Sequence, residues 1–93
     1  MNIYVIMYHS FYGTNNAYYD VINTIKSLGE WQHPANELWF IKSEDSLQSI
    51  LEKVMMSCNA KDVLFVSKLG EHGKDYMGYM QNSLWSWLKK INK

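Results

Sequence analysis

Arginine is absent from this chain, because all nine basic residues are lysines. Arginine is the side chain that most often forms two-pronged hydrogen bonds to phosphate, guanine and carboxylate groups. Its absence, together with a balance of nine basic against nine acidic residues, argues against sequence-specific DNA reading and against an arginine-finger mechanism. Nucleic acid is therefore an unfavoured partner, although a local patch of lysines is left open.

Cysteine and long apolar runs are also scarce. Cys58 is the one cysteine, so no disulfide can form within the chain and no cysteine-based zinc site is expected. This usage is typical of a reducing compartment, and a cytoplasmic location is expected. The apolar run at residues 3–8 is too short to cross a membrane and lacks the basic segment of a signal peptide.

The remaining composition is that of one folded domain over residues 1–93. Apolar residues make up 47% of the chain, and the aromatic rings are seven Tyr, four Trp and three Phe. Such a chain is too apolar to be disordered and too short to build two separate cores.

Three apolar segments predict β-strands, at residues 3–8, 37–42 and 63–66. The first shows little alternation, so we expect a central strand that is buried on both faces. Residues 31–36 contain the only proline, Pro34. They are expected to form an edge strand or a turn, because proline donates no hydrogen bond to a neighbouring strand.

Apolar residues at helical spacing predict a first helix over 17–28, with Asn15 or Asn16 as its cap and Gly29 as its end. A second helix is expected to begin at Ser43 and continue to Cys58. Glu44 and Asp45 would then lie at its positive end.

The last third of the chain has a different texture. Three glycines interrupt residues 69–80, so this segment is expected to be a loop. A short last helix is expected from Asn82 or Ser83 to Ile91, with Lys89 and Lys90 at its carboxyl end.

The order strand–helix–strand–strand–helix–strand–helix predicts an α+β, ferredoxin-like fold with an extra C-terminal helix. In that fold one antiparallel sheet carries both main helices on one face. The other face must then be covered by the last helix, by a partner chain or by a ligand. Four tryptophans make a bare sheet face unfavourable.

His9 follows the first strand, at a position where related sheets often carry a catalytic acid. Its imidazole suits Zn²⁺ or proton transfer, or it is simply the first residue of the loop. His33 and His72 lie 24 and then 39 residues further on, which matches no compact metal motif. Ser10 has no recognisable nucleophile setting, and Cys58 is expected to be an inert core thiol. No catalytic residue, metal or cofactor is therefore assigned.

Aromatic side chains gather around the loop that follows the first strand. Rings can stack on nucleic-acid bases, but that use requires a basic groove, and no lysine precedes Lys26. Tyr and Trp are also enriched in protein–protein contacts, while core packing accounts for about half of the rings. The candidate binding residues are Tyr8, His9, Phe11, Tyr12, Trp31 and Trp39.

Short segments along nearly the whole chain resemble a family of small bacterial proteins labelled SinR family, which differ from the biofilm repressor of that name. The matching segments are residues 4–8, Ile-Lys-Ser-Leu-Gly at 25–29, Trp-Gln-His at 31–33, residues 38–42, Gly-Glu at 70–71 and Trp-Leu-Lys at 87–89. That family is similar to the ferredoxin-like CRISPR adaptation protein that bridges integrase dimers. The resemblance implies a ferredoxin-like homodimer. Some of those proteins are metal-dependent nucleases that use an Asp where this chain has His9.

The sequence thus predicts a small non-catalytic adaptor or inhibitor module that binds protein and acts as a homodimer. The alternative is a divalent-metal-dependent nuclease acting on RNA or DNA, with His9 as its key residue and Glu71 or Asp75 supplying oxygen. Whether the protein is an enzyme stays open at this point. A third reading, non-specific nucleic-acid binding, would show a steep salt dependence.

Overall fold

The computed structural model describes residues 1–90, and its elements follow the predicted order. The strands are β1 (Asn2–His9), β2 (Glu30–Ala35), β3 (Leu38–Ser43) and β4 (Val63–Lys68). The helices are α1 (Asn16–Ser27), α2 (Leu47–Met55) and α3 (Asn82–Lys89). The predicted α+β class and element order are confirmed.

The four strands form one antiparallel sheet in the order β2-β3-β1-β4. β1 pairs with β3 on one side and with β4 on the other, so its predicted central position is confirmed. β3 lies between β1 and β2, and β1 lies between β3 and β4. Each β-α-β unit is therefore split by a central strand of the other unit.

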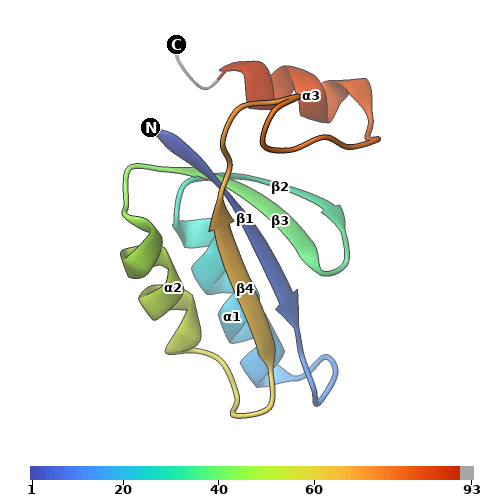
Figure 1. Cartoon of the computed structure of the whole chain (residues 1–93). Helices are drawn as coiled ribbons and strands as arrows, with labels where there is room; N and C mark the ends of the chain where they lie inside the picture. Colours follow the sequence, from blue (N-terminus) through green and yellow to red (C-terminus); the bar gives the residue numbers. More distant parts are fainter. Residues whose placement is uncertain (91–93) are drawn as a thin grey trace.

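Helices α1 and α2 cover one face of the sheet, behind the strands in Figure 1. The core between these layers is built from alternate residues of β1 and β3 and from the inner faces of both helices. Its fully buried members include Tyr4, Ile6, Val21, Ile25, Trp39, Ile41, Ile50 and Val54.

Helix α3 covers only one end of the opposite face, at the top of Figure 1. Leu84 and Leu88 of α3 pack there against Ile3 and Phe40. The expectation that β1 is buried on both faces is wrong beyond this end, because Met7 stays 44% exposed.

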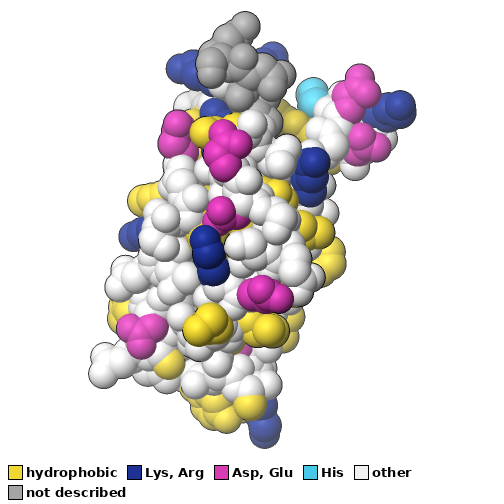
Figure 2. Space-filling view, turned by 90° about the vertical axis from the view of Figure 1, so that its left-hand side faces the viewer, with side chains coloured by type: hydrophobic (Ala, Val, Ile, Leu, Met, Phe, Trp, Pro, Cys, Tyr) yellow, Lys and Arg dark blue, Asp and Glu magenta, His cyan; other side chains and the backbone are white. Residues whose placement is uncertain are grey.

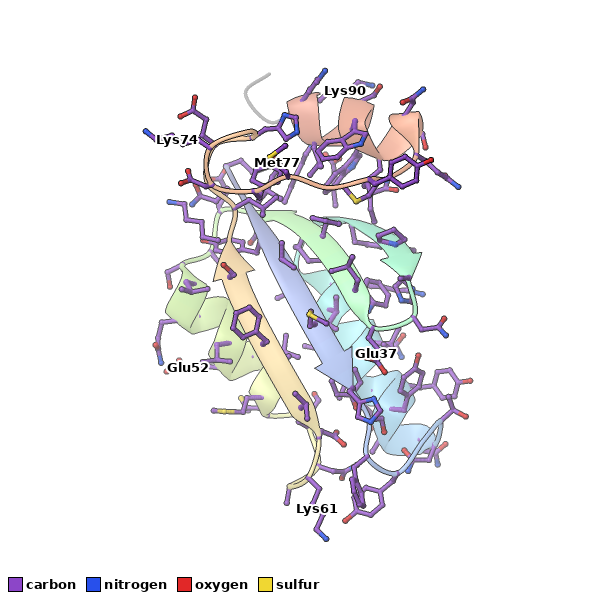
Figure 3. The ribbon with its side chains drawn as sticks, turned by 45° about the vertical axis from the view of Figure 1, so that its right-hand side comes forward. Glu37, Glu52, Lys61, Lys74, Met77 and Lys90 are labelled. Carbon is purple, nitrogen blue, oxygen red and sulfur yellow. The ribbon has the colours of Figure 1, made fainter. Side chains whose placement is uncertain are left out.

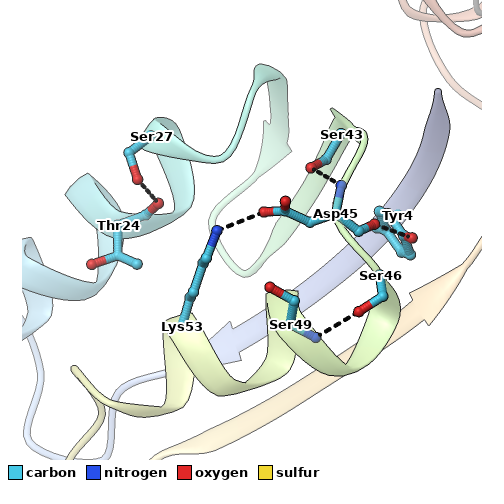
Figure 4. A network of polar contacts seen from close by, with 8 residues as sticks. All are labelled: Tyr4, Thr24, Ser27, Ser43, Asp45, Ser46, Ser49 and Lys53. Atoms are coloured by element: carbon cyan, nitrogen blue, oxygen red, sulfur yellow. Dashed lines mark hydrogen bonds and ion pairs between the residues drawn. The ribbon is translucent and has the colours of Figure 1, made fainter.

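The start of α2 differs from the prediction. Ser43 is the last residue of β3, and the helix begins at Leu47 with Ser46 as its cap. The Ser46 hydroxyl accepts a hydrogen bond from the Ser49 N–H at 3.1 Å (Figure 4). The helix does not start earlier, because the backbone of Asp45 is held in other hydrogen bonds. Its carbonyl accepts the buried Tyr4 hydroxyl at 2.6 Å, and its N–H donates to the Ser43 hydroxyl.

Other local predictions fare better. Asn15 caps α1 by accepting a hydrogen bond from the Tyr18 N–H at 2.9 Å. Residues 30–35 form an edge strand whose register is irregular between Gln32 and Ala35, beside Pro34.

The predicted helix end at Ile91 lies outside the described residues. Over residues 1–90 none of the helices has the length and apolarity required to cross a bilayer.

Candidate interaction surface

The open sheet face, which we define as the face opposite α1 and α2, presents an apolar row beyond the end that α3 covers. Met7 in β1 is the register partner of both Leu38 in β3 and Phe65 in β4. Because residues at the same register position share a face of the sheet, these three side chains form one row. Figure 3 views the sheet from this side.

The exposure of this row is high for apolar side chains on a sheet. Phe65 is 59% exposed, and Val63, two residues before it on the same face, is 58% exposed. The loop after β4 extends the apolar surface at its upper border, where Met77 is 81% exposed (Figure 3). The structure thus leaves large apolar side chains of β1 and β4 in solvent on one face of the sheet.

A polar pair borders the row at the carboxyl end of β1. His9 Nδ1 lies 2.7 Å from a carboxylate oxygen of Glu37, and both side chains are about half exposed. His9 is also the register partner of Val63. A polar rim around an apolar centre is the usual layout of a protein–protein contact.

Beneath this rim, Asp62 fixes the shape of the loop after β1. One carboxylate oxygen accepts the N–H of Phe11 at 3.0 Å. The other accepts the Tyr8 hydroxyl and the Asn59 N–H, each at 2.9 Å. These bonds tie the chain after β1 to the turn before β4, and they occupy both carboxylate oxygens.

This arrangement shifts two pKa values. Desolvation, reinforced by the hydrogen bond to Asp62, raises the pKa of Tyr8 to about 12. Partial burial opposes ionisation of Asp62, but the hydrogen bonds from Asn59, Phe11 and Tyr8 outweigh it and lower the pKa of Asp62. Asp62 is thus held as a carboxylate that accepts three donors, which is a structural role.

Of the candidate binding residues, four lie at the surface. Phe11 and Tyr12 are each 56% exposed, and their rings meet edge to face at 5.0 Å. Trp31 is 40% exposed on β2. His9 lies at the rim of the open sheet face, as described above.

Two candidate binding residues require correction. Tyr8 is 2% exposed and Trp39 is 0% exposed, so neither belongs to a contact surface. Both point toward the helices, because Tyr8 and Trp39 alternate with the open-face residues of their strands. The Trp39 ring is covered by the ring of His33, stacked at 3.7 Å, and by Trp31 at 5.5 Å.

The exposed residues Met7, Val63 and Phe65 were not among the candidates. They lie in apolar runs without alternation, which predict strands buried on both faces. Only the partial cover of the sheet by α3 leaves them at the surface. No pattern within the strands themselves distinguishes the exposed members from the buried ones.

The predicted oxygen ligands of a nuclease site also require correction. Glu71 and Asp75 follow β4 at the end where Leu69 bonds to Ile3, whereas His9 pairs with Val63 at the other end. Asp75 accepts the Glu71 N–H at 2.7 Å within its own turn. The carboxylate that the fold brings to His9 is that of Glu37 instead.

The histidines do not share a site. His33 stacks on Trp39, whereas His72, in the loop after β4, packs beside Tyr76 of that loop and Trp85 of α3. Over residues 1–90, no three His, Cys, Asp or Glu side chains are grouped so that they could hold a metal ion.

Cys58 lies at the margin of the main core and is not a nucleophile in an activating setting. Its Sγ contacts the Val54 carbonyl at 3.5 Å. Partial burial, together with the nearby Asp62 carboxylate, raises the pKa of the Cys58 thiol. A raised pKa reduces the thiolate fraction and therefore the reactivity.

Comparisons with known proteins gave no match to this chain among family models, curated proteins or solved structures.

Proposed function

We propose that this protein is a small non-catalytic adaptor or inhibitor module that binds protein through its open sheet face and acts as a homodimer. The observation that carries the proposal is the row formed by Leu38, Met7 and Phe65, in which the large apolar side chains of Met7 and Phe65 stay in solvent. Covering these side chains would remove apolar surface from water at about 25 cal/mol per Å².

The layout of the surface supports contact with a protein rather than with a small molecule. A standard protein–protein interface covers about 800 Å² on each partner. The row on the sheet and the adjoining Val63 provide an apolar centre, Met77 extends it at its upper border, and His9 with Glu37 provides a polar rim. An isologous dimer, in which each chain offers the same patch, covers the row on both chains at once.

The same proposal includes the finer fold assignment. Split β-α-β units in a four-stranded antiparallel sheet support a ferredoxin-like arrangement with α3 as an addition. The resemblance to SinR-family proteins implies this fold and a homodimer. Membership of that family is therefore part of the proposal.

Light scattering coupled to size-exclusion chromatography tests the dimer. At tens of micromolar protein we expect twice the 11.0 kDa mass of the chain. The double substitution Met7→Ser with Phe65→Ser is expected to give a monomer with unchanged circular dichroism. The control is Met56→Ser, because Met56 is 87% exposed at the end of α2, away from the open sheet face. A monomeric wild-type protein at 100 micromolar concentration would contradict the homodimer.

The alternative function, a divalent-metal-dependent nuclease, is favoured by the exposed pair of His9 and Glu37 at the end of a central strand. It is tested by incubating the protein with labelled RNA and DNA in the presence of Mg²⁺, Mn²⁺ or Zn²⁺. Cleavage that is lost in both His9→Ala and Glu37→Gln would replace the proposal of a non-catalytic module. Intact substrates under all of these conditions are expected from the adaptor function.

A further inference from the structure

We propose that the outer edge of β4, together with the largely apolar groove between β4 and α2, binds an extended peptide segment of a partner protein. The segment adds a fifth strand to the sheet. This inference specifies a partner for the proposed protein-binding function and rests on that function. It uses a different surface from the open sheet face, so the two can be tested separately.

The two edges of the sheet differ in how well they are protected. The β2 edge contains Pro34 and an irregular register, both of which hinder the addition of another strand. The β4 edge pairs with β1 in continuous register over residues 63–68 and contains no proline. Among residues 1–90 no further strand pairs with β4.

Backbone groups of β4 are available at this edge. The Leu69 N–H donates to the Ile3 carbonyl at 2.8 Å, which sets the alternation of hydrogen bonds between the two strands. By that alternation the N–H and C=O groups of Leu64 and Val66 point away from β1. An extended peptide satisfies these groups as an antiparallel or parallel neighbour would.

A groove beside the edge provides places for side chains. Most of its lining is apolar, from Leu51 and Met55 of α2, Leu64 of β4, and Cys58 and Ala60 in the connection between them. Asn59 and Asp62 line it as well, and both Asp62 carboxylate oxygens already accept hydrogen bonds from within the chain. Figure 2 shows the α2 side of the molecule, on which hydrophobic side chains lie among polar and acidic ones. Because side chains of a strand alternate, every second residue of the added segment would enter the groove.

Charge favours one kind of occupant. Lys61 precedes β4 and Lys68 ends it, so a cation lies at each end of the edge. Neither forms an ion pair within residues 1–90, and Lys61 Nζ lies 5.1 Å from the Phe11 ring. The matching segment has apolar residues at alternate positions and an acidic residue near each end. A second copy of β4 carries lysines at the same places and does not supply this complementarity.

Selection from a displayed library of linear 12-residue peptides on the immobilised protein tests the inference. We expect enriched peptides with alternating apolar residues and acidic flanks. In ¹⁵N NMR spectra such a peptide is expected to shift the amides of Leu64, Val66 and Lys68 and of the adjoining part of α2. Failure to enrich any peptide, or shifts confined to other surfaces, would overturn the inference.

Backbone methylation distinguishes strand addition from binding through side chains alone. N-methylation of an enriched peptide at amides that face β4 is expected to weaken binding at least tenfold. Methylation of the intervening amides is expected to change it less than about twofold. Equal effects at both sets of positions would contradict the addition of a strand.

Charge reversal provides a matched pair of variants. Lys61→Glu with Lys68→Glu is expected to weaken the acidic-flanked peptide at least tenfold and to improve binding of a version with lysine flanks. The control, Lys74→Glu, changes an exposed lysine in the loop that follows β4 (Figure 3) and is expected to leave binding unchanged.

The outcome for the proposed function is read separately. Peptide binding by a wild-type protein that proves monomeric at 100 micromolar concentration would reject the homodimer and keep this inference. A dimer that binds no peptide would reject this inference and keep the homodimer. Concentration-dependent shifts of the β4 amides without peptide would make a second copy the occupant and overturn the inference.

Discussion

The ammonium group of Lys42 donates a hydrogen bond to the backbone carbonyl of Trp87 at 2.7 Å and lies 4.3 Å from the centre of the Trp87 ring. Lys42 belongs to β3 and is only 4% exposed, whereas Trp87 lies in the last turn of α3. Carbonyls at the end of a helix carry partial negative charge, so a cation is favourable there. This contact joins α3 to the sheet, in addition to the packing of Leu84 and Leu88 against Ile3 and Phe40.

Replacing Lys42 by methionine is expected to loosen α3. Methionine keeps an unbranched apolar stem but removes the charged donor, and hydrogen bonds to charged groups contribute about 1.5–3 kcal/mol. We expect the free energy of unfolding in urea to fall by about that amount and proteolysis of residues 69–81 to accelerate. The control, Lys89→Met, removes an exposed lysine from the same helix and is expected to change stability by less than about 0.5 kcal/mol. Unchanged stability in Lys42→Met would show that the contact does not hold α3.

The chain at Gly29 passes so close to β3 that a side chain does not fit. A Cβ atom at Gly29 would collide with the backbone carbonyl oxygen of Lys42. Gly29→Ala is therefore expected to lower the free energy of unfolding by about 1–3 kcal/mol, because the backbone must move to relieve the overlap. The matched control is Gly78→Ala, where the nearest atoms lie at an ordinary 3.8 Å. Equal stabilities of the two variants, measured by urea unfolding, would contradict this close approach.

Tyr8 is expected to make stability decrease at alkaline pH. Desolvation, aided by the hydrogen bond to Asp62, raises the pKa of Tyr8 from 10.0 to about 12 in the folded state. The folded chain then keeps a proton that the unfolded chain releases. The contribution is therefore complete below pH 10 and is lost as the pH rises through about 12. The corresponding loss of stability is on the order of 2 kcal/mol.

Urea unfolding between pH 8 and pH 11.5 measures this dependence. Tyr8→Phe is expected to flatten the alkaline slope while lowering stability at pH 8 by about 1 kcal/mol, since Asp62 loses one donor. Tyr12→Phe, at an exposed position, should retain the wild-type slope. The same steep slope in all three proteins would show that Tyr8 is not the group responsible.

Prediction from the sequence succeeded where neighbouring residues decide the structure. The strand at residues 3–8 is confirmed, and of the two predicted caps, Asn15 and Asn16, the structure uses Asn15. Strand-forming side chains and a capping carboxamide act within a few residues of themselves. The start of α2 was wrong because two bonds that involve Asp45, one of them to the distant Tyr4, keep the chain before Leu47 out of the helix. That constraint is invisible in the local pattern.

The candidate site shows the same division. Composition alone indicated that aromatic and apolar residues exceed what a small core needs, but it gave no means to separate Tyr8, which is buried, from Met7, which is exposed. Adjacent residues of a strand point to opposite faces, so the burial of each side chain depends on which face the helices cover. Likewise the partner of His9 is Glu37, 28 positions away, because the β1–β3 pairing brings them together.

The sequence by itself determined the kinds of elements, their order and the absence of an arginine or disulfide chemistry, since these depend on composition and short-range spacing. Tertiary structure alone decided which apolar residues stay in solvent, which edge of the sheet is open and where α3 is fastened. Those outcomes depend on the pairing register and on packing between segments far apart in the chain, and both are set by all the contacts at once.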